Sequence, residues 1–425
     1  MRMDNETFRL KVENLFNSLR SADGDGTSRM IMAELEQLAA TPRKSRYFLK
    51  AVAAQDDPAL QEHFYRLVFS RVRTDQEASD LERHIRHMFY TDREHAKAIL
   101  ARVATRETLP ALFRVIALTE EGWLAGELIR IVLSAPPEEL LEPLEQALDS
   151  QEYLLQCLAI YLIGKSGDDR HLQALARFYR RPVGEKLDRL EKKSLDALLE
   201  GAKNCSEELV IKWLRDKSSR VRSVALTIAQ DRMLLSATSD IVSLVLIDPK
   251  TRPKAAATVL LFEAEGSLRL VPDHPTAQSV VQLIQSAKQD ALQATLGQLM
   301  RDESPSVREV AVKLVPFLQD PSSLAAPVRR LAIEDRSSSV QAAALRALVK
   351  ADRPRLIPVL IEIFTDAGAT AASRDVIDVA NSIMEEYLDE EEIAAVNEGV
   401  REKEEQRDAA LDRFLGEVEW WRHDL

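Results

Sequence analysis

Hydrophobic residues recur at intervals of three and four along most of the chain, which is the spacing of one face of an α-helix. Short stretches rich in Pro, Asp, Gly and Ser separate these amphipathic runs. After Asp302, the pattern predicts a helix over about Ser306–Leu318, a break at QDPSS and a second helix over about Ser323–Ile333. The same alternation elsewhere predicts an all-α chain of antiparallel helix pairs.

Some of these segments also repeat in sequence. The run DKSSRVRSVALTIA begins at Asp216 and DESPSVREVAVKLV begins at Asp302, and both place Val, Arg and Ala at the same offsets from the Asp. A further copy begins at Asp335, with Gln341 in place of the Arg, and a weaker copy begins at Asp248. The starts are 32, 54 and 33 residues apart, and the longest interval holds the extra segment GSLRLVPDHPTAQ. A period in the low thirties predicts stacked helix pairs, since one pair cannot bury its apolar face alone.

These copies resemble HEAT repeats, in particular the bacterial variety shared with phycobilisome-lyase-type repeats. The segment AIYLIGKSGDDRHLQAL is similar to the A-x-x-L-G-x-x-G-D turn of that variety, with Gly167 and Asp168 matching. In HEAT repeats an Asp and a cation six residues later form a ladder between successive units, so the resemblance implies such a ladder here. An Asp in this place can also cap a helix start. The implied ladder residues are Asp216, Arg222, Asp248, Lys254, Asp302, Arg308 and Asp335.

The resemblance implies an all-α, HEAT-like α-solenoid of stacked antiparallel helix pairs over residues 110–380. Within it, residues 182–215 keep a helical periodicity without the Asp/Arg pair. Residues 1–109 are helical by pattern without a defined repeat, so we expect either a cap or diverged repeats there. Residues 381–425 are expected to form an acidic C-terminal helical segment that ends in Trp-Trp.

The composition agrees with a helical chain, because only 5% of the residues are aromatic and 13 are Gly. Of the net charge of −12, residues 381–425 carry −10. A basic stretch with aromatic neighbours, TPRKSRYFLK, could bind nucleic acid, but residues 1–110 hold 18 Lys/Arg and 17 Asp/Glu. This mixture is typical of a solvated surface, so we expect no nucleic-acid binding.

The chain begins MRMDNETFRL, with acidic residues where a secretory signal has an apolar core. Its apolar stretches are far shorter than the roughly 20 residues that span a bilayer. We therefore expect a cytoplasmic protein without membrane insertion, in which Cys157 and Cys205 are reduced, buried thiols. The resemblance to the bacterial repeat variety implies a bacterial source.

Two stretches could hold a metal. His84 and His87 lie three residues apart with Asp80 one turn before them, but Arg83 and Arg86 disfavour a cation there, so an exposed polar helix face is the favoured interpretation. The run SADGDGTS resembles a calcium loop but has Met in place of the terminal Glu ligand. Phosphate-loop and nucleophile motifs are absent from the sequence. We expect neither a cofactor nor catalytic residues.

The C-terminal segment carries Leu411, Phe414 and Val418 on one helix face, and Trp420 and Trp421 follow. Such a helix either folds back to cap the last repeat or inserts its aromatic residues into a partner. Terminal repeats need a polar outer cover, which favours capping. In the docking alternative, Phe414, Trp420 and Trp421 would contact the partner.

These observations together predict a non-catalytic scaffold or regulatory adaptor that binds another protein on the concave surface made by the second helices. Two alternatives come from the family resemblance. One is a bilin lyase or chromophore chaperone, although no residue here marks a bilin site. The other is a HEAT-like DNA glycosylase or DNA-binding protein, which needs a strongly positive inner surface.

Overall fold

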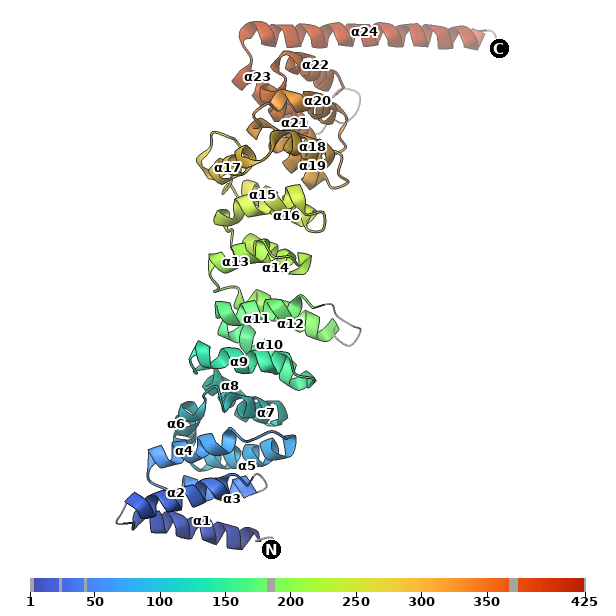
Figure 1. Ribbon diagram of the computed structural model, residues 1–425. Coiled ribbons are helices and arrows are strands. Elements are labelled where there is room, and N and C mark those ends of the chain that lie inside the picture. Colours follow the sequence, from blue (N-terminus) through green and yellow to red (C-terminus); the bar gives the residue numbers. More distant parts are fainter. Residues whose placement is uncertain (1–3, 23–24, 42–43, 182–187, 367–373, 424–425) are drawn as a thin grey trace. The chain divides into compact units, whose positions relative to one another are not determined.

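The computed structural model describes residues 4–22, 25–41, 44–181, 188–366 and 374–423. Every regular element in these ranges is a helix (Figure 1). The helices form two compact units, residues 1–209 and 210–425.

The first unit contains α1 (Asn5–Arg20), α2 (Asp25–Ala39), α3 (Ser45–Ala53), α4 (Pro58–Phe69), α5 (Asp75–Thr91), α6 (Arg93–Val103), α7 (Leu109–Leu118), α8 (Gly122–Leu133), α9 (Pro137–Leu148), α10 (Tyr153–Ser166), α11 (Asp169–Tyr179) and α12 (Asp188–Gly201). α13 (Glu207–Leu214) crosses the division. The second unit continues with α14 (Ser219–Asp231), α15 (Thr238–Ile247), α16 (Arg252–Ala264), α17 (Gln278–Ser286), α18 (Gln289–Leu299), α19 (Pro305–Lys313), α20 (Ala325–Glu334), α21 (Ser338–Ala351), α22 (Leu356–Asp366), α23 (Arg374–Tyr387) and α24 (Glu390–His423).

Helices of the first unit lie in two layers. In one layer α1, α3, α5, α7, α10 and α12 pack successively, and in the other α2, α4, α6 and α8 do so. α5 packs on α7, so the layers continue across residue 109. The helices before this residue stack in the same way as those after it.

The second unit has the same two-layer plan. α14, α16, α19, α21 and α23 pack successively in one layer, and α15, α17, α18, α20 and α22 form the other. α24 packs on α22 (Figure 1). The extra segment in the long interval between repeat copies forms a short 3-10 helix, η4 (Pro275–Ala277), which leads into α17.

The predicted helices around Asp302 differ from the structure in two ways. The first helix ends at Lys313 instead of Leu318, because Pro316 has no N–H to donate and its ring excludes a regular α-helical turn. In addition, α20 and α21 form a tight antiparallel pair with Asp335 in the turn between them. A ladder Asp therefore lies inside a helix pair, not at its start.

Buried side chains between the layers hold the stack together. Near the N-terminus Phe16, Phe48 and Phe64 are each almost fully buried and their ring centroids lie 5.3–6.2 Å apart. Rings at this separation add edge-to-face attraction to the burial of apolar surface. The core of the first pairs thus comes from α1, α3 and α4 together, which explains why no single pair could fold alone.

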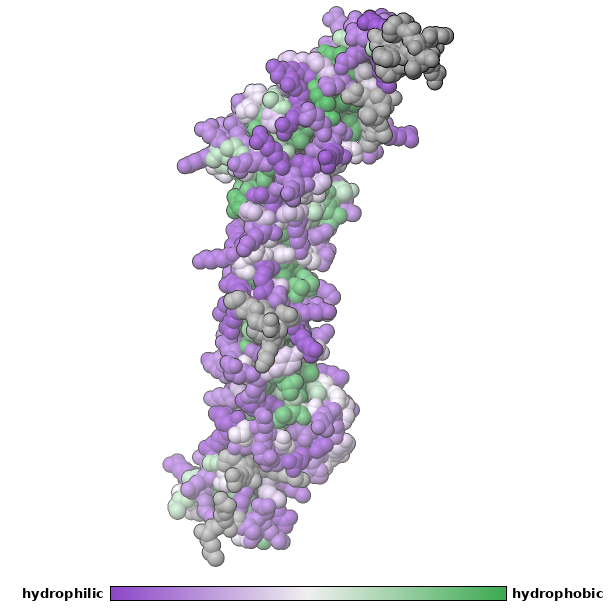
Figure 2. Space-filling model, turned by 90° about the vertical axis from the view of Figure 1, so that its right-hand side faces the viewer, coloured by the Kyte–Doolittle hydropathy of each residue, from purple (hydrophilic) through white to green (hydrophobic). Residues whose placement is uncertain are grey.

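The face drawn in Figure 2 is mainly hydrophilic, and apolar residues gather on it in small separate patches. Among the described residues, no helix combines the length and the apolar character that crossing a bilayer requires.

Candidate functional site

The ladder is most complete between Arg308 and Asp335. Nε and Nη2 of Arg308 donate to the two carboxylate oxygens of Asp335 at 2.7 and 2.8 Å, and Nη1 donates to the carbonyl of Asp302 at 2.9 Å. Asp335 also accepts a hydrogen bond from the N–H of Ser337 at 2.9 Å. Burial acts to raise the pKa of the Asp335 carboxyl, but the hydrogen bonds from Arg308 and Ser337 outweigh it and hold this pKa below its usual value. One guanidinium thus ties α19 to the turn of the next pair.

Arg222 and Asp248 repeat this geometry. Nε of Arg222 donates to Asp248 at 2.8 Å, and Nη1 donates to the carbonyl of Asp216 at 2.6 Å. The Asp216 carboxylate accepts from the N–H of Ser218 at 2.9 Å, at the start of α14. In both places the Asp organises its own turn and the Arg reaches forward to the next one.

Lys254 departs from the ladder. Its Nζ donates to the carbonyl of Ser223 at 2.7 Å and also contacts the hydroxyl of Thr227, so it reaches back to α14. Asp302 instead has Arg252 as its neighbour, with Nη1 3.8 Å from the carboxylate. The extra helix α17 lies between these copies in the chain, which changes the position from which a cation can reach Asp302.

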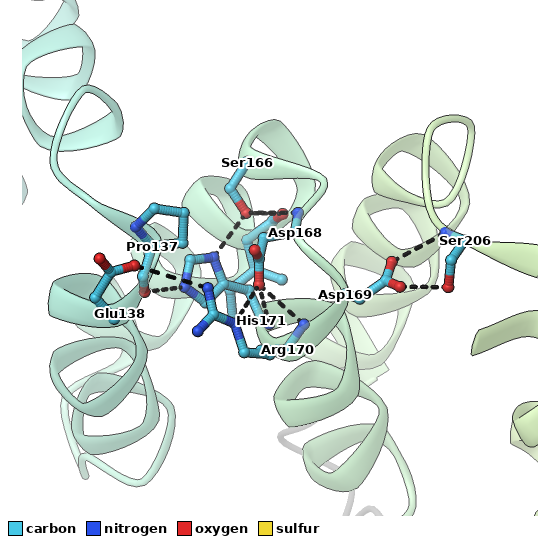
Figure 3. Close-up of polar contacts among 9 residues, drawn as sticks. Pro137, Glu138, Ser166, Asp168, Asp169, Arg170, His171 and Ser206 are labelled. Atoms are coloured by element: carbon cyan, nitrogen blue, oxygen red, sulfur yellow. Dashed lines mark hydrogen bonds and ion pairs between the residues drawn. The ribbon is translucent and has the colours of Figure 1, made fainter. Parts of the chain in front are cut away.

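The turn from α10 to α11 contains the Gly167–Asp168 motif (Figure 3). α10 ends at Gly167, whose φ of 62° lies in the left-handed region that favours glycine. The Asp168 carboxylate caps α11 by accepting from the N–H groups of Arg170 and His171 at 2.9 and 3.4 Å. The sequence GDD therefore encodes one helix end and the next helix start.

Neighbouring polar contacts fix this turn against the helices on either side (Figure 3). His171 is 1% exposed and lies between the hydroxyl of Ser166, at 3.0 Å, and the carbonyl of Pro137, at 2.9 Å. Because the carbonyl only accepts, Nε2 of His171 carries the hydrogen. Asp169, which follows the capping residue Asp168, accepts a hydrogen bond from the N–H of Ser206 at 3.1 Å. This network therefore connects the α10–α11 turn to the preceding and the following helices.

Replacing Asp168 with Ala should lower the free energy of unfolding by about 1 kcal/mol, because two N–H groups of α11 lose their acceptor. Asp168→Asn should retain most of the cap. Burial acts to raise the pKa of Asp168, but its interactions with Arg170 and His171 together outweigh burial and lower this pKa. The stabilisation is therefore present above the unfolded-state pKa and is lost as the pH falls through the folded-state pKa. Urea unfolding near neutral pH and at about pH 3 tests this, and an equal loss at both would contradict it.

The prediction that His84 and His87 lie on an exposed polar helix face is wrong for His84. His84 is 3% exposed, and its Nε2 lies 2.9 Å from the hydroxyl of Tyr65. The reason is its position on α5 beside Leu81, Ile85 and Met88, which are buried. His87 is exposed. The carboxylate of Asp80 forms an ion pair with Arg83, with 3.4 Å between Oδ1 and Nη2.

In the described part of the chain, no cluster of three His, Cys, Asp or Glu residues could hold a metal. The side chains of Asp23 and Asp25, from the calcium-like loop, lie outside the described residues. Cys205 is buried and Cys157 is half-buried, and neither forms a disulfide with another described residue.

In the basic stretch TPRKSRYFLK, the ring of Phe48 is not available for stacking with a nucleic-acid base. Phe48 is fully buried, and the Tyr47 hydroxyl accepts from Asn5 at 3.1 Å. Nζ of Lys44 lies 5.0 Å from the ring centroid of Phe8. Arg43 and the side chain of Arg46 lie outside the described residues.

The C-terminal helix is partly packed and partly exposed. In α24, Val396 is fully buried, and Gly399 lies so close to Ile361 of α22 that a Cβ would approach it to 2.4 Å. From residue 401 to residue 411 every described side chain is exposed. The side chains of Phe414, Trp420 and Trp421 lie outside the described residues, so their docking role stays a prediction.

A groove of about 1150 Å³ lies on the second unit, on the layer that contains α18, α20 and α22. Part of its lining is small and apolar, namely Ala294, Gly297, Ala326, Pro327, Pro358 and Val359. Four arginines and three carboxylates also line it. A smaller pocket of about 370 Å³ lies beside the Arg222–Asp248 pair.

A family model described as HEAT repeats matches residues 292–378, which extend from α18 into α23. The chain contains HEAT repeats. The matched HEAT repeats hold the Arg308–Asp335 pair and most of the groove. No curated protein matches the sequence.

Several solved structures are similar to the chain. A chain of the Pds5–Scc1 complex is 12% identical with a TM-score of 0.33, over 93% of this chain and 71% of that one. Kap121p bound to Ste12p is 10% identical with a TM-score of 0.24, over 90% of this chain and 54% of that one. A structure from work on microtubule polymerases with TOG domain arrays is 11% identical with a TM-score of 0.21, over 94% of this chain and 98% of that one. The chain thus spans about half the length of Kap121p.

Sequence reasoning did not find the groove of the HEAT repeats. Its residues come from α18, α20, α22 and the turns next to them, which are separated in the chain by helices of the other layer, and they share no repeated motif. One available signal was the cluster Arg329–Arg330 on α20, which breaks the apolar pattern of that helix.

Proposed function

We propose that this protein is a non-catalytic scaffold or adaptor that binds a protein partner on the groove face of its second unit. The observation that supports this is the groove of α18, α20 and α22, which combines an apolar floor with several charged side chains. Stacked repeats often use extended surfaces of this kind for binding. The binding surface was expected on the second helices, whereas α20 precedes α21 in the pair that Asp335 joins, so the proposed surface is defined by α18, α20 and α22 themselves.

The charge of the groove favours a protein over the two alternatives. DNA needs a strongly positive surface, whereas Asp290, Glu334 and Glu362 line this groove and would repel phosphates. A linear tetrapyrrole is of drug-like size, and pockets for such ligands usually hold about 300–1,000 Å³ and enclose most of the ligand. The groove exceeds this range, which favours an extended partner.

The exposed part of α24 is a second candidate surface. Residues 401–411 lie beyond the packed contact of Gly399 with Ile361, and their described side chains are all exposed. A helix that continues past its support is suited to a partner, and the predicted docking residues Phe414, Trp420 and Trp421 follow it. The part of α24 up to residue 400 packs on α22, whereas the capping role expected for the segment from Leu411 onward stays a prediction.

Affinity capture from an extract of the cells that make the protein, read by mass spectrometry, tests both surfaces. The baits are the full chain, Gly297→Trp, Gly126→Trp and a chain ending at residue 403. A Cβ on Gly297 would have only Leu324 near it, at 3.7 Å, so a larger side chain can extend into the groove. Gly126 is the matched control, because a Cβ there meets nothing within 4 Å and it lies in the first unit. Ending at 403 spares Val396 and Gly399, which ending at 380 would remove.

We expect a stoichiometric protein that the full chain, Gly126→Trp and the shortened chain retain and that Gly297→Trp loses. Loss only with the shortened chain would move the site to α24. Recovery of nucleic acid or a coloured small molecule in place of a protein would overturn the proposal.

A further inference from the structure

Three guanidinium groups in the groove have no partner within the described part of the chain. Among the residues that the structure describes, the side chains of Arg301, Arg329 and Arg330 make neither an ion pair nor a hydrogen bond. Arg301 and Arg330 are exposed and Arg329 is half-buried. The fourth arginine, Arg355, forms an ion pair with Asp352, with 3.6 Å between Nε and the carboxylate oxygen. The groove therefore presents unused donors to solvent.

Several other arginines of the same unit are paired, in contrast to these three. Arg222 and Arg308 bind the ladder aspartates at 2.7 Å, and Nη2 of Arg215, beside the smaller pocket, donates to Asp240 at 3.0 Å. Arg353 donates to the carbonyl of Tyr387 at 2.8 Å. The three guanidiniums of the groove, two on α20 and one in the turn after α18, form a local concentration of anion-binding groups. Guanidinium is the side-chain group best suited to bidentate contact with a carboxylate.

The floor between these arginines suits a peptide backbone. Gly297, Ala294 and Ala326 are small, so a chain can approach the helices closely, while Pro358 and Val359 offer apolar contact. With about 1150 Å³, the groove has room for several residues of an extended segment.

The carboxylates of the groove disfavour a ligand that is negatively charged along its whole length. Asp290, Glu334 and Glu362 lie in the same lining as the four arginines, so the groove carries only one net positive charge. A uniform polyphosphate would meet repulsion at three places, whereas a peptide can place its acidic side chains at the arginines alone. This pattern favours a peptide over a nucleic acid.

We propose that the groove between α18, α20 and α22 binds a linear peptide segment in which Asp or Glu residues alternate with apolar ones, with the carboxylates held by Arg301, Arg329 and Arg330. The inference rests on the proposed scaffold function and names the chemistry of the partner. The apolar side chains of the peptide lie on the floor of the groove, and its backbone crosses Gly297.

The test is an array of synthetic peptides that combine apolar residues with acidic, neutral, basic or phosphoserine residues. It is probed with the full chain, with the triple variant Arg301→Glu/Arg329→Glu/Arg330→Glu, and with the control Arg269→Glu/Arg336→Glu/Arg374→Glu. The control reverses three exposed arginines outside the groove and so makes the same change in net charge. Circular dichroism confirms that each variant keeps its helices.

We expect the full chain and the control to select Asp- and Glu-containing peptides, and the groove variant to bind them at least about tenfold more weakly and to select basic peptides instead. No acidic preference, or the same preference in all three proteins, would overturn the inference. Binding of phosphoserine peptides without binding of Asp or Glu peptides would also overturn it, as would displacement of the peptides by a single-stranded oligonucleotide at equal concentration. If the groove variant still captures a protein partner from extract, the scaffold function stands and only the acidic-peptide assignment fails.

Discussion

Replacing Arg308 with Ala should lower the free energy of unfolding by about 2–3 kcal/mol. The side chains of Arg308 and Asp335 are 14% and 4% exposed, and the substitution leaves the carboxylate buried with only the N–H of Ser337 to bind it. Breaking a buried ion pair on one side is costly because the remaining charge is no longer compensated. Urea unfolding of the full chain measures the loss, and the binding of peptides to the groove should not change.

The loss should depend on pH in a defined direction. The hydrogen bond from Arg308 lowers the pKa of Asp335 below its unfolded-state value, so the pair stabilises the fold above that value and its contribution disappears as the pH falls through the folded-state pKa. The difference between the wild-type chain and Arg308→Ala should therefore shrink in acid. Arg336→Ala is the matched control, because this arginine is exposed one residue beyond Asp335 and should change stability by less than about 0.5 kcal/mol.

A structural bridge and a ligand contact give opposite results in this experiment. Unchanged stability of Arg308→Ala together with loss of partner binding would show that Arg308 is a binding residue. Equal effects of Arg308→Ala and Arg336→Ala would show that the ion pair contributes no more than surface charge does.

The helical repeat could be predicted because it depends on local pattern. The three-and-four spacing of apolar residues and the recurring Asp turn are properties of single segments, and both predict stacked helix pairs. The pairs at Arg222 and Arg308 lie as the six-residue spacing suggests, because an uninterrupted repeat brings the next Asp within reach. For Lys254 the spacing is insufficient, since α17 intervenes in the chain before Asp302.

Features that depend on neighbouring helices could not be predicted. His84 is polar and its sequence neighbours include arginines, but its burial is decided by Tyr65 of α4, whose hydroxyl lies 2.9 Å away. The groove likewise needs α18, α20 and α22 side by side, and no sequence spacing indicates that Arg301 and Arg330 line one surface. The continuation of the stack before residue 109 was left open for the same reason, because interlayer contacts such as those of Phe16, Phe48 and Phe64 carry no repeated motif.

Close approach of two helices makes Gly164 the second position with a large expected effect. A Cβ on Gly164 of α10 would lie 3.0 Å from both Cα and Cβ of Ala197 and 3.1 Å from its carbonyl oxygen, all on α12. The first and last of these are backbone atoms, so the whole of α12 would have to shift. Overpacking of this kind typically costs about 1–3 kcal/mol.

Gly164→Ala should therefore lower the free energy of unfolding by about 1 kcal/mol, because the overpacking cost exceeds the gain of about 1 kcal/mol that Ala has over Gly inside a helix. Gly297→Ala supplies the comparison, since its Cβ would make only an ordinary contact with Leu324 at 3.7 Å and should raise stability by about 0.5–1 kcal/mol. Urea unfolding gives the two values, and hydrogen exchange shows whether the loss for Gly164→Ala lies in α10 and α12. A stabilised Gly164→Ala would mean that α12 can move away from α10 at little cost, so the close contact would not be what holds this pair in register.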